Sequence, residues 1–337
     1  MGCYALRSSM FLGGTMATEQ KIKILAVVGP TASGKTAISV ELAKRLGGEV
    51  VSCDSMQIYR RMNIGTAKPT AEETCGIAHH LIDAVEPDAP FSCAEYVVAA
   101  GEAAKDISAR GKLPILCGGT GLYLDRFLCG EMEETHADED LRASLFAYAE
   151  ENGIEALHAR LREVDPESAD AIHPNNVKRV VRALEIYEQT GIPKSEFDRR
   201  SQAVESPYDA VVIGLHYPRR EVLYERINRR VDMMLADGLL EETKKLLDEG
   251  VFDVNLTAAQ AIGYKELLGY LDGRETLTEA TENLKTATRR YAKRQLTWFG
   301  AKPYVEWVEM EKDGTLRSLD EICEEIISRF QREEERA

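Results

Sequence analysis

The chain of 337 residues is long enough to bury a substantial core, as one domain with a large insertion or as two domains. Its 44% hydrophobic and 29% charged residues are typical of a soluble globular protein, and no apolar stretch is long enough to span a membrane. The net charge of −15 argues against indiscriminate nucleic-acid binding. A local basic groove stays compatible with this charge, because distant charges are screened.

The seven cysteines are odd in number and include no C-x-x-C pair, which indicates free thiols in a reducing compartment. The six histidines show no spacing typical of metal ligands. We therefore expect a cytoplasmic protein without structural zinc and without membrane association. We also expect a monomer, although the sequence itself does not give the oligomeric state. Residues 1–20 lack a signal peptide and a myristoylation pattern, and we expect them to form a disordered leader.

Residues 22–28 form an apolar run that predicts a buried strand, and residues 37–46 carry apolar side chains at helical spacing. Between them lies the pattern G-x-x-x-x-G-K-T, made of Gly29, Pro30, Thr31, Ala32, Ser33, Gly34, Lys35 and Thr36. Strand, glycine-rich loop and helix are the setting of a P-loop, in which backbone N–H groups and a helix N-terminus bind phosphate. Lys35 adds a positive charge, and Thr36 adds a hydroxyl for a divalent cation. The pattern does not identify the phosphate compound.

Further strands are predicted at 49–53 and 113–117, with a helix between them from about Ser92 to Arg110. This alternation predicts an α/β fold of the P-loop NTPase type, a parallel sheet with helices on both faces. Ligands of such sheets bind at the carboxyl ends of the strands. Because the P-loop, Asp54 and Thr120 all follow strands, we expect them to share one active site.

The chain is expected to divide at changes of composition. Residues 21–130 form the first part of the P-loop core, and the polar, charged and helical residues 131–207 form an insertion domain. Residues 208–318 return to the core with a strand at 209–215 and include a long helix at about 277–298. Residues 319–337 form an acidic helical tail.

Asp54 allows three interpretations. It could hold a metal ion as a Walker B aspartate does, act as a general base, or only form an Asx-turn or helix cap. The neighbouring Ser55 and Gln57 supply a hydroxyl and an amide, which together suit a polar base edge. Thr120 lies in the segment 118–121, G-G-T-G, which either lets a ligand approach the backbone or only makes a tight turn.

Basic side chains gather in three helical stretches: Lys178, Arg179 and Arg182; Arg226, Arg229 and Arg230; and Arg289, Arg290, Lys293 and Arg294. A single cluster of this kind is commonly a solvated helix face. Three clusters in an acidic chain favour contacts with the phosphates of a nucleic acid.

Six segments together are much more specific than any one of them. They are the P-loop, D-S-M-Q-I-Y at 54–59, G-T-A-K-P at 65–69, G-G-T-G-L-Y at 118–123, Q-A-I-G-Y-K at 260–265 and Y-A-K-R-Q-L-T-W-F at 291–299. Over about residues 21–298 the chain closely resembles the tRNA dimethylallyltransferase (tRNA isopentenyltransferase) family. Larger eukaryotic relatives carry a zinc finger after the core. Cys323 is the only cysteine after Cys129, so the chain resembles the compact bacterial type.

The resemblance implies transfer of a dimethylallyl group from dimethylallyl pyrophosphate to the exocyclic amine of the adenine 3′ of the anticodon in tRNA. The P-loop would bind the pyrophosphate with Mg²⁺, whose protein ligand would be Thr36. Arg230 is a further candidate for binding the pyrophosphate. Asp54 would be the base, Lys35 would stabilise the leaving group, and Thr120 would lie near the acceptor.

The adenine would have to be flipped out of the anticodon loop, and bases splayed in this way are the usual target in RNA recognition. The tRNA contacts implied are Asp54, Ser55, Met56, Gln57 and Thr120 around the adenine; Lys178, Arg179, Val180, Val181 and Arg182 on the anticodon arm; and Gln260, Lys265, Arg290 and Arg294.

Three other functions stay open at this point. A prenyltransferase acting on free adenine nucleotide would use the same loop and aspartate, but would not need the basic insertion. A P-loop small-molecule kinase would use Lys35, Thr36 and Asp54 for ATP and Mg²⁺. A P-loop switch or RNA-binding scaffold would bind its ligands without turnover.

Overall fold

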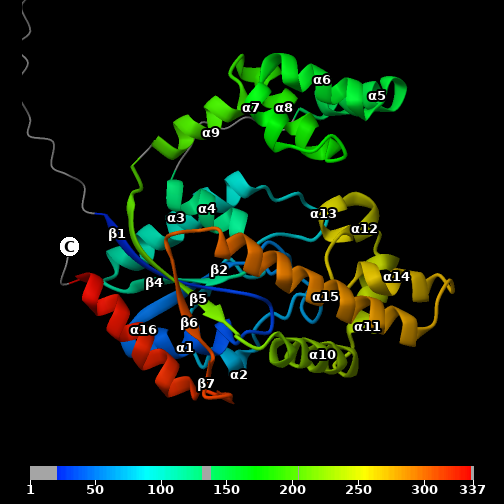
Figure 1. The fold of residues 1–337 in the computed structure, drawn as a ribbon. Helices are drawn as coiled ribbons and strands as arrows, with labels where there is room; N and C mark the ends of the chain where they lie inside the picture. Colours follow the sequence, from blue (N-terminus) through cyan, green and yellow to red (C-terminus); the bar gives the residue numbers. More distant parts are fainter. Residues whose placement is uncertain (1–20, 131–137, 204, 335–337) are drawn as a thin grey trace, which may run out of the picture.

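The structure, a computed structural model, describes residues 21–130, 138–203 and 205–334. Its centre is a parallel sheet of six strands in the order β3-β2-β4-β1-β5-β6 (Figure 1). The strands are β1 (Ile22–Val28), β2 (Gly48–Cys53), β3 (His79–His80), β4 (Leu113–Gly118), β5 (Tyr208–His216) and β6 (Val305–Glu309). The predicted α/β class and the parallel sheet are therefore confirmed. The predicted leader lies outside the described residues.

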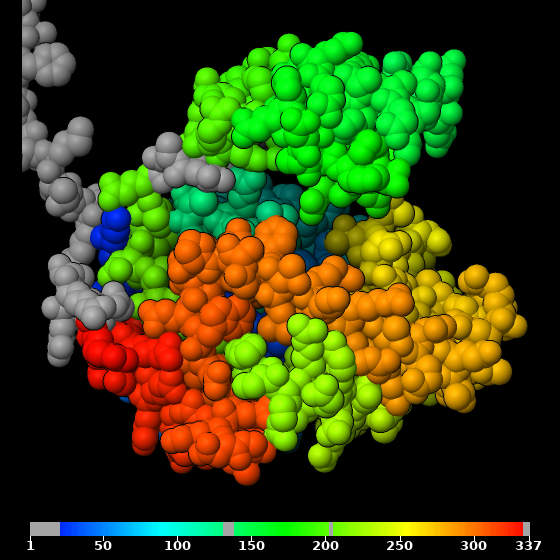
Figure 2. All heavy atoms as spheres, viewed as in Figure 1, coloured from blue at the N-terminus to red at the C-terminus, as the bar shows by residue number. Residues whose placement is uncertain are grey.

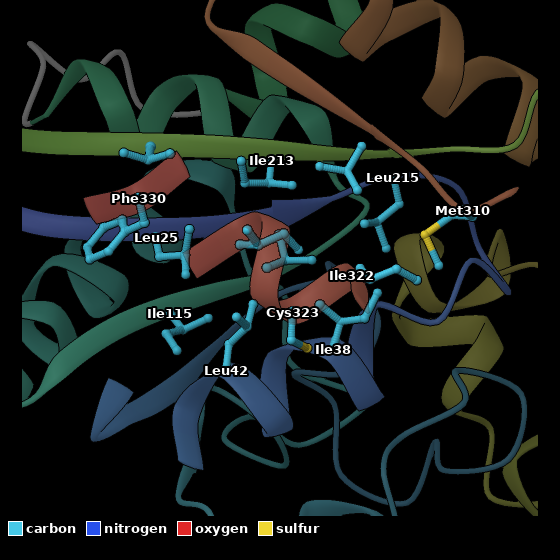
Figure 3. Close-up of a cluster of buried hydrophobic side chains, with 14 of the residues drawn as sticks. Leu25, Ile38, Leu42, Ile115, Ile213, Leu215, Met310, Ile322, Cys323 and Phe330 are labelled. Atoms are coloured by element: carbon cyan, nitrogen blue, oxygen red, sulfur yellow. The ribbon is translucent and has the colours of Figure 1, made fainter. Parts of the chain in front are cut away.

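Helices cover both faces of the sheet, because its central strands are apolar on both sides. On one face, Leu25 of β1 and Ile213 of β5 pack against α1 (Lys35–Leu46) and α16 (Leu319–Glu334) (Figure 3). On the other face, Ile24 and Val212 pack against α3 (Cys93–Ala109) and α4 (Gly121–Cys129). Ser92 begins α3 with a capping box, as its sequence position predicted.

The register of the central strands determines where the loops emerge. Val28, the last residue of β1, lies beside Gly118 at the end of β4, and Gly118 lies beside Cys53 at the end of β2. Only glycine fits at 118, because a Cβ there would lie 2.0 Å from the carbonyl oxygen of Cys53. The residues that follow these three strand ends therefore leave the sheet side by side.

The segment after α4 forms a separate helical body with its own core. Its helices are α5 (Glu139–Asn152), α6 (Ile154–Val164), α7 (Pro166–Ala171), α8 (Val177–Thr190) and α9 (Lys194–Ala203). Leu157, Leu161 and Leu184 pack inside this body, which we call the insertion domain. A hollow separates much of it from the core in the view of Figure 2. Residues 131–137, the predicted start of this domain, lie outside the described part of the chain.

A second helical group packs beside the sheet. It consists of α10 (Arg220–Ala236), α11 (Leu239–Asp248), α12 (Val251–Val254), α13 (Leu256–Ala259), α14 (Lys265–Leu271) and α15 (Leu277–Gly300). The short helix α2 (Ala71–Thr74) lies against α1. A small antiparallel hairpin, β7 (Glu311–Lys312) and β8 (Thr315–Leu316), precedes α16. None of the helices in the described residues is both long and apolar enough to cross a membrane.

The sequence analysis did not anticipate β6, and it left open whether the acidic tail packs on the core. The tail forms α16, and its apolar stripe of Ile322, Cys323, Ile326 and Phe330 is buried between the sheet and α1. The acidic residues lie on the opposite face of this amphipathic helix, which is why its charge does not prevent packing.

Because Ile326 is 0% exposed, truncation to alanine should remove well-packed methyl groups from the core. We expect Ile326→Ala to lower the free energy of unfolding by about 2–5 kcal/mol, measured by urea denaturation. Gln331→Ala, an exposed substitution on the same helix, should change it by less than about 0.5 kcal/mol. If Ile326→Ala lowered the free energy of unfolding as little as Gln331→Ala does, α16 would not contribute to the core.

Candidate active site

The carboxyl ends of β1, β2 and β4 open into a cavity of about 480 Å³. Its lining comes from the P-loop, from the segments after β2 and β4, and from α10 and α15. The lining residues are Thr31, Ala32, Ser33, Gly34, Lys35, Thr36, Ala37, Asp54, Gln57, Thr66, Glu73, Cys117, Gly118, Arg226, Arg229, Arg230, Met233, Tyr291 and Gln295. The predicted phosphate loop and the predicted base, Asp54, thus face the same cavity.

The P-loop has the backbone geometry that anion binding requires. Gly34 has φ +96° at the N-terminus of α1, a left-handed conformation that glycine adopts without strain. Lys35 turns back over the loop, and its Nζ donates to the carbonyl oxygens of Gly29 (3.0 Å) and Pro30 (2.7 Å). Burial, reinforced by the nearby Arg230 guanidinium, lowers the pKa of Lys35 to about 8. A bound anion would restore the charged amine.

Three arginines of α10 form the wall opposite the P-loop. Arg226 Nε donates to the carbonyl oxygen of Ala32 (2.9 Å), and Arg230 Nη1 lies 3.3 Å from Thr31 Oγ1. Burial also lowers the pKa of Arg230, although Asp54 and Glu73 oppose this effect. Arg230 was a sequence-based candidate for binding the pyrophosphate, whereas Arg226 and Arg229 were noted only as basic residues.

Asp54 forms the Asx-turn that its sequence position allowed, because its Oδ1 accepts the N–H of Met56 (2.9 Å). Its Oδ2 accepts no hydrogen bond from the described residues. One oxygen therefore orients the carboxylate and the other is left for a ligand. The turn and a catalytic role are compatible with each other.

Thr120 reaches across from β4 to the segment after β2. Its Oγ1 accepts the N–H of Ser55 (3.0 Å), and Tyr291 lines the cavity nearby. Burial, and then the charge of Asp54, raise the pKa of Tyr291 well above its usual value, so its hydroxyl stays protonated. The structure thus brings Asp54, Ser55 and Thr120 together, as predicted, and adds the tyrosine.

The side-chain amide of Gln57 makes hydrogen bonds within the protein, although the sequence analysis expected it to contact the edge of the adenine. Its Oε1 accepts from Ser52 Oγ (3.0 Å), and its Nε2 donates to the carbonyl oxygens of Thr66 (3.3 Å) and Ala67 (3.2 Å). In this structure both ends of the amide are occupied. Gln57 therefore fixes the loop that carries the G-T-A-K-P motif.

Glu242 of α11 holds the start of that loop. Its carboxylate accepts the N–H groups of Ile64 and Gly65 and the hydroxyl of Tyr264 (2.7 Å). Gly65 must be glycine, because a Cβ there would lie 2.5 Å from the Tyr264 ring. The G-T-A-K-P and Q-A-I-G-Y-K motifs therefore contact each other through Gly65 and Tyr264.

The structure distributes the predicted tRNA contacts differently from the sequence analysis. Lys178 and Arg179 are exposed at the start of α8 and have no partner among the described residues. Val180 and Val181 are 0% and 2% exposed in the core of the insertion domain, so the expectation that their side chains contact tRNA is wrong. Their hydrophobicity serves packing. Arg182 pairs with the buried Glu185 (2.6 Å).

The remaining predicted contacts lie outside the cavity. Gln260 and Lys265 are exposed at the two ends of their motif, and Arg290 is exposed on α15. Arg294 is also exposed, and its guanidinium carbon lies 5.5 Å from the centre of the Tyr291 ring. These positions leave all four side chains accessible to a large ligand.

Two lining residues of α15, Tyr291 and Gln295, were not among the predicted site residues. They are four residues apart, so they lie on one face of the helix. The Y-A-K-R-Q segment contained this signal, but the prediction followed its basic residues, which lie on the neighbouring, exposed side of the helix. Gln295 is 5% exposed and hydrogen-bonds to both the P-loop and the turn after β4.

The lining suits a magnesium ion that is shared with a phosphate ligand. Thr36 lines the cavity, and its hydroxyl makes no hydrogen bond to any described residue. Within the described residues, no three His, Cys, Asp or Glu side chains gather into a metal site. Mg²⁺ commonly takes one or two protein oxygens, with water and substrate phosphates as its other ligands. Thr36 fits that pattern, and Asp54 and Glu73 are the carboxylates of the cavity lining.

Comparisons with known proteins point to a single family. A family model described as IPP transferase matches residues 57–302, and one described as isopentenyl transferase matches residues 22–86. The tRNA dimethylallyltransferase of Halalkalibacterium halodurans is 50% identical over 312 residues, covering 92% of this chain and 98% of that protein. That of Geobacillus thermodenitrificans is 53% identical over 289 residues, covering 86% and 90%.

Solved structures agree. A tRNA isopentenylpyrophosphate transferase from Bacillus halodurans superimposes with a TM-score of 0.68 at 48% identity, covering 94% of this chain and 99% of that one. A eukaryotic dimethylallyltransferase acting on tRNA gives a TM-score of 0.73 at 32% identity, covering 85% and 73%.

The lowered pKa of Lys35 predicts how anion binding depends on pH. The amine is charged below about pH 8 and neutral above it, so affinity for inorganic pyrophosphate should fall as the pH rises through 8. From the charged fraction alone, we expect about tenfold weaker binding at pH 9 than at pH 7, measured by calorimetry. Lys35→Met, which has no charge to lose, should show no such decline. A decline of equal size in this variant would place its cause elsewhere.

Proposed function

The chain belongs to the IPP transferase family, and we propose that it transfers a dimethylallyl group from dimethylallyl pyrophosphate to the exocyclic amine of the adenine 3′ of the anticodon in tRNA. The observation that carries this proposal is the shared cavity, in which a P-loop faces Asp54. The donor requires a loop that binds its diphosphate. The acceptor amine requires a carboxylate with one oxygen available to take its proton. All of these residues come from one chain.

The donor binds through its diphosphate. The amides at the start of α1, Lys35 and the α10 arginines surround the position where the charge increases as the C1–O bond breaks. The electron pair of this bond leaves with pyrophosphate, and preorganised positive groups stabilise that charge in the transition state. When bound, Mg²⁺ supplies further positive charge for the departing pyrophosphate, with the Thr36 hydroxyl as its protein ligand.

The acceptor amine forms the new bond to C1 and loses one proton. This amine is a poor nucleophile, because its lone pair is conjugated with the adenine ring. Asp54 Oδ2 takes the proton as the bond forms, while the Asx-turn at Oδ1 keeps the carboxylate oriented. General-base assistance of this kind contributes typically about 10²–10⁴-fold in rate. Tyr291 lines the cavity together with the base, and Thr120 accepts the N–H of Ser55, the residue that follows Asp54.

The tRNA delivers the adenine by flipping it out of the anticodon loop, at a cost of a few kcal/mol. We place the nucleic-acid strand in the hollow that Figure 2 shows between the insertion domain and the core. Lys178 and Arg179 of α8 and Arg290 and Arg294 of α15 are exposed cations for its phosphates. The overall charge of −15 restricts binding to such local surfaces.

A direct assay combines the purified protein with an unmodified tRNA transcript, dimethylallyl pyrophosphate and Mg²⁺, followed by mass spectrometry of the digested RNA. We expect one added C5H8 unit on the adenine beside the anticodon. Asp54→Asn should lower the single-turnover rate by about 10²–10⁴-fold while tRNA binding persists. Asp209→Asn, at the exposed amino end of β5, is the matched control and should leave the rate unchanged.

Parallel reactions separate the other functions. Transfer to AMP without transfer to tRNA would overturn the proposal in favour of a nucleotide prenyltransferase. Phosphoryl transfer from ATP without prenyl transfer would favour a kinase, and binding without turnover would favour a scaffold.

The exposed cations of α8 predict a salt-dependent contribution to tRNA binding. We expect Lys178→Ala combined with Arg179→Ala to weaken tRNA binding and to reduce the slope of log affinity against log salt by about one to two. Arg162→Ala, on α6 of the same domain and paired with Asp170, should have little effect. Filter binding at several salt concentrations provides the measurement. An unchanged slope in the double variant would remove α8 from the interface.

A further inference from the structure

Gln295 joins two loops of the active site that are far apart in the sequence. Its Oε1 accepts the N–H of Thr31 in the P-loop (2.8 Å), and its Nε2 donates to the carbonyl oxygen of Gly119 after β4 (3.0 Å). Both ends of the amide are therefore used, inside a buried environment where an unpaired polar group would be costly. One side chain of α15 thus connects the donor side of the cavity to the acceptor side.

The glycine opposite Gln295 shows how closely the two segments fit. A Cβ at Gly119 would lie 2.0 Å from Gln295 Nε2, far inside contact distance. The φ of Gly119 is not in the left-handed region, so the backbone itself does not require glycine there. The space taken by the Gln295 amide is what excludes a side chain at 119.

The link acts at the point where the sheet no longer fixes the chain. Strand register aligns Val28 with Gly118, but Thr31 and Gly119 already belong to the loops that follow. Gly119 continues into Thr120, whose hydroxyl accepts the N–H of Ser55 next to Asp54. The distance between the phosphate loop and the base therefore depends on the Gln295 bridge.

We propose that Gln295 is a positioning residue for the transfer reaction, which sets the spacing between the diphosphate-binding loop and the turn beside Asp54. This inference rests on the proposed function. It implies that Gln295 contributes to the rate of the chemical step and little to the affinity for either substrate alone. Reacting groups that are held in the wrong relative position lose rate steeply, by about 10²-fold for 1 Å.

The first test compares wild type with Gln295→Met, a substitution of similar size that removes both hydrogen bonds. We expect the single-turnover rate of transfer at saturating substrates to fall about 10–100-fold, while dissociation constants for pyrophosphate and for tRNA stay within about threefold. An unchanged rate would overturn the inference. So would a loss of pyrophosphate affinity as large as the loss of rate, because Gln295 would then act in donor binding.

The second test uses Gly119→Ala, which should displace the Gln295 amide and lower the rate in the same way. In a Gln295→Ala background the added methyl group meets no amide, so Gly119→Ala should cost little more there. Such non-additivity identifies the contact itself. Additive losses in the double variant would overturn the inference. Gly300→Ala, in α15 with no atom within 4 Å of its built Cβ, is the matched control and should keep the wild-type rate.

The activity of the wild-type protein shows whether the proposed function or only the positioning role of Gln295 has failed. If the wild-type protein transfers no dimethylallyl group to tRNA, the proposed function fails. If the wild type is active and the Gln295 and Gly119 variants keep its rate, only the positioning role fails. Thermal unfolding of each variant distinguishes a specific loss of rate from general destabilisation, which would lower the melting temperature and the substrate affinities together.

Discussion

The in-register ends of β1, β4 and β2 are the constraint on which the rest of the site depends. Parallel pairing places Val28, Gly118 and Cys53 in one row, and the absence of a side chain at Gly118 lets β2 and β4 approach closely there. The phosphate loop, the Thr120 turn and Asp54 follow directly. The sheet aligns the segments, and the helices α10 and α15 then close the cavity with arginines, Tyr291 and Gln295.

The electrostatics of the cavity are opposite in sign to those of the molecule. The chain carries a net charge of −15, yet the lining contains Lys35 and three arginines against Asp54 and Glu73. Burial of Lys35 lowers its pKa to about 8, which means that the empty site holds its positive charge at a cost. A diphosphate relieves this cost when it binds, so the burial of Lys35 and Arg230 favours an anionic ligand.

Much of this architecture could be predicted from the sequence, because local patterns determine it. The P-loop, its flanking strand and helix, and the capping box at Ser92 are all encoded within a few residues. Gln295 and Tyr291 were not predicted, because their role depends on which face of α15 turns toward the cavity. The prediction for Val180 failed in a similar way, because the sequence did not show that this residue lies on the buried face of α8. The strand β6 is short, and among the described strands it pairs with β5 alone, a partner distant in sequence, so local propensity did not reveal it.

The central claim is that donor and acceptor meet in one cavity between Lys35 and Asp54. A crystal structure of the protein with a non-hydrolysable thio analogue of the donor, Mg²⁺ and an anticodon stem-loop tests it most directly. The account predicts the diphosphate on the P-loop amides and Lys35, and the flipped adenine with its amine within hydrogen-bond distance of Asp54 and facing C1 of the donor. An adenine bound outside the cavity, or a diphosphate held away from the P-loop, would contradict it.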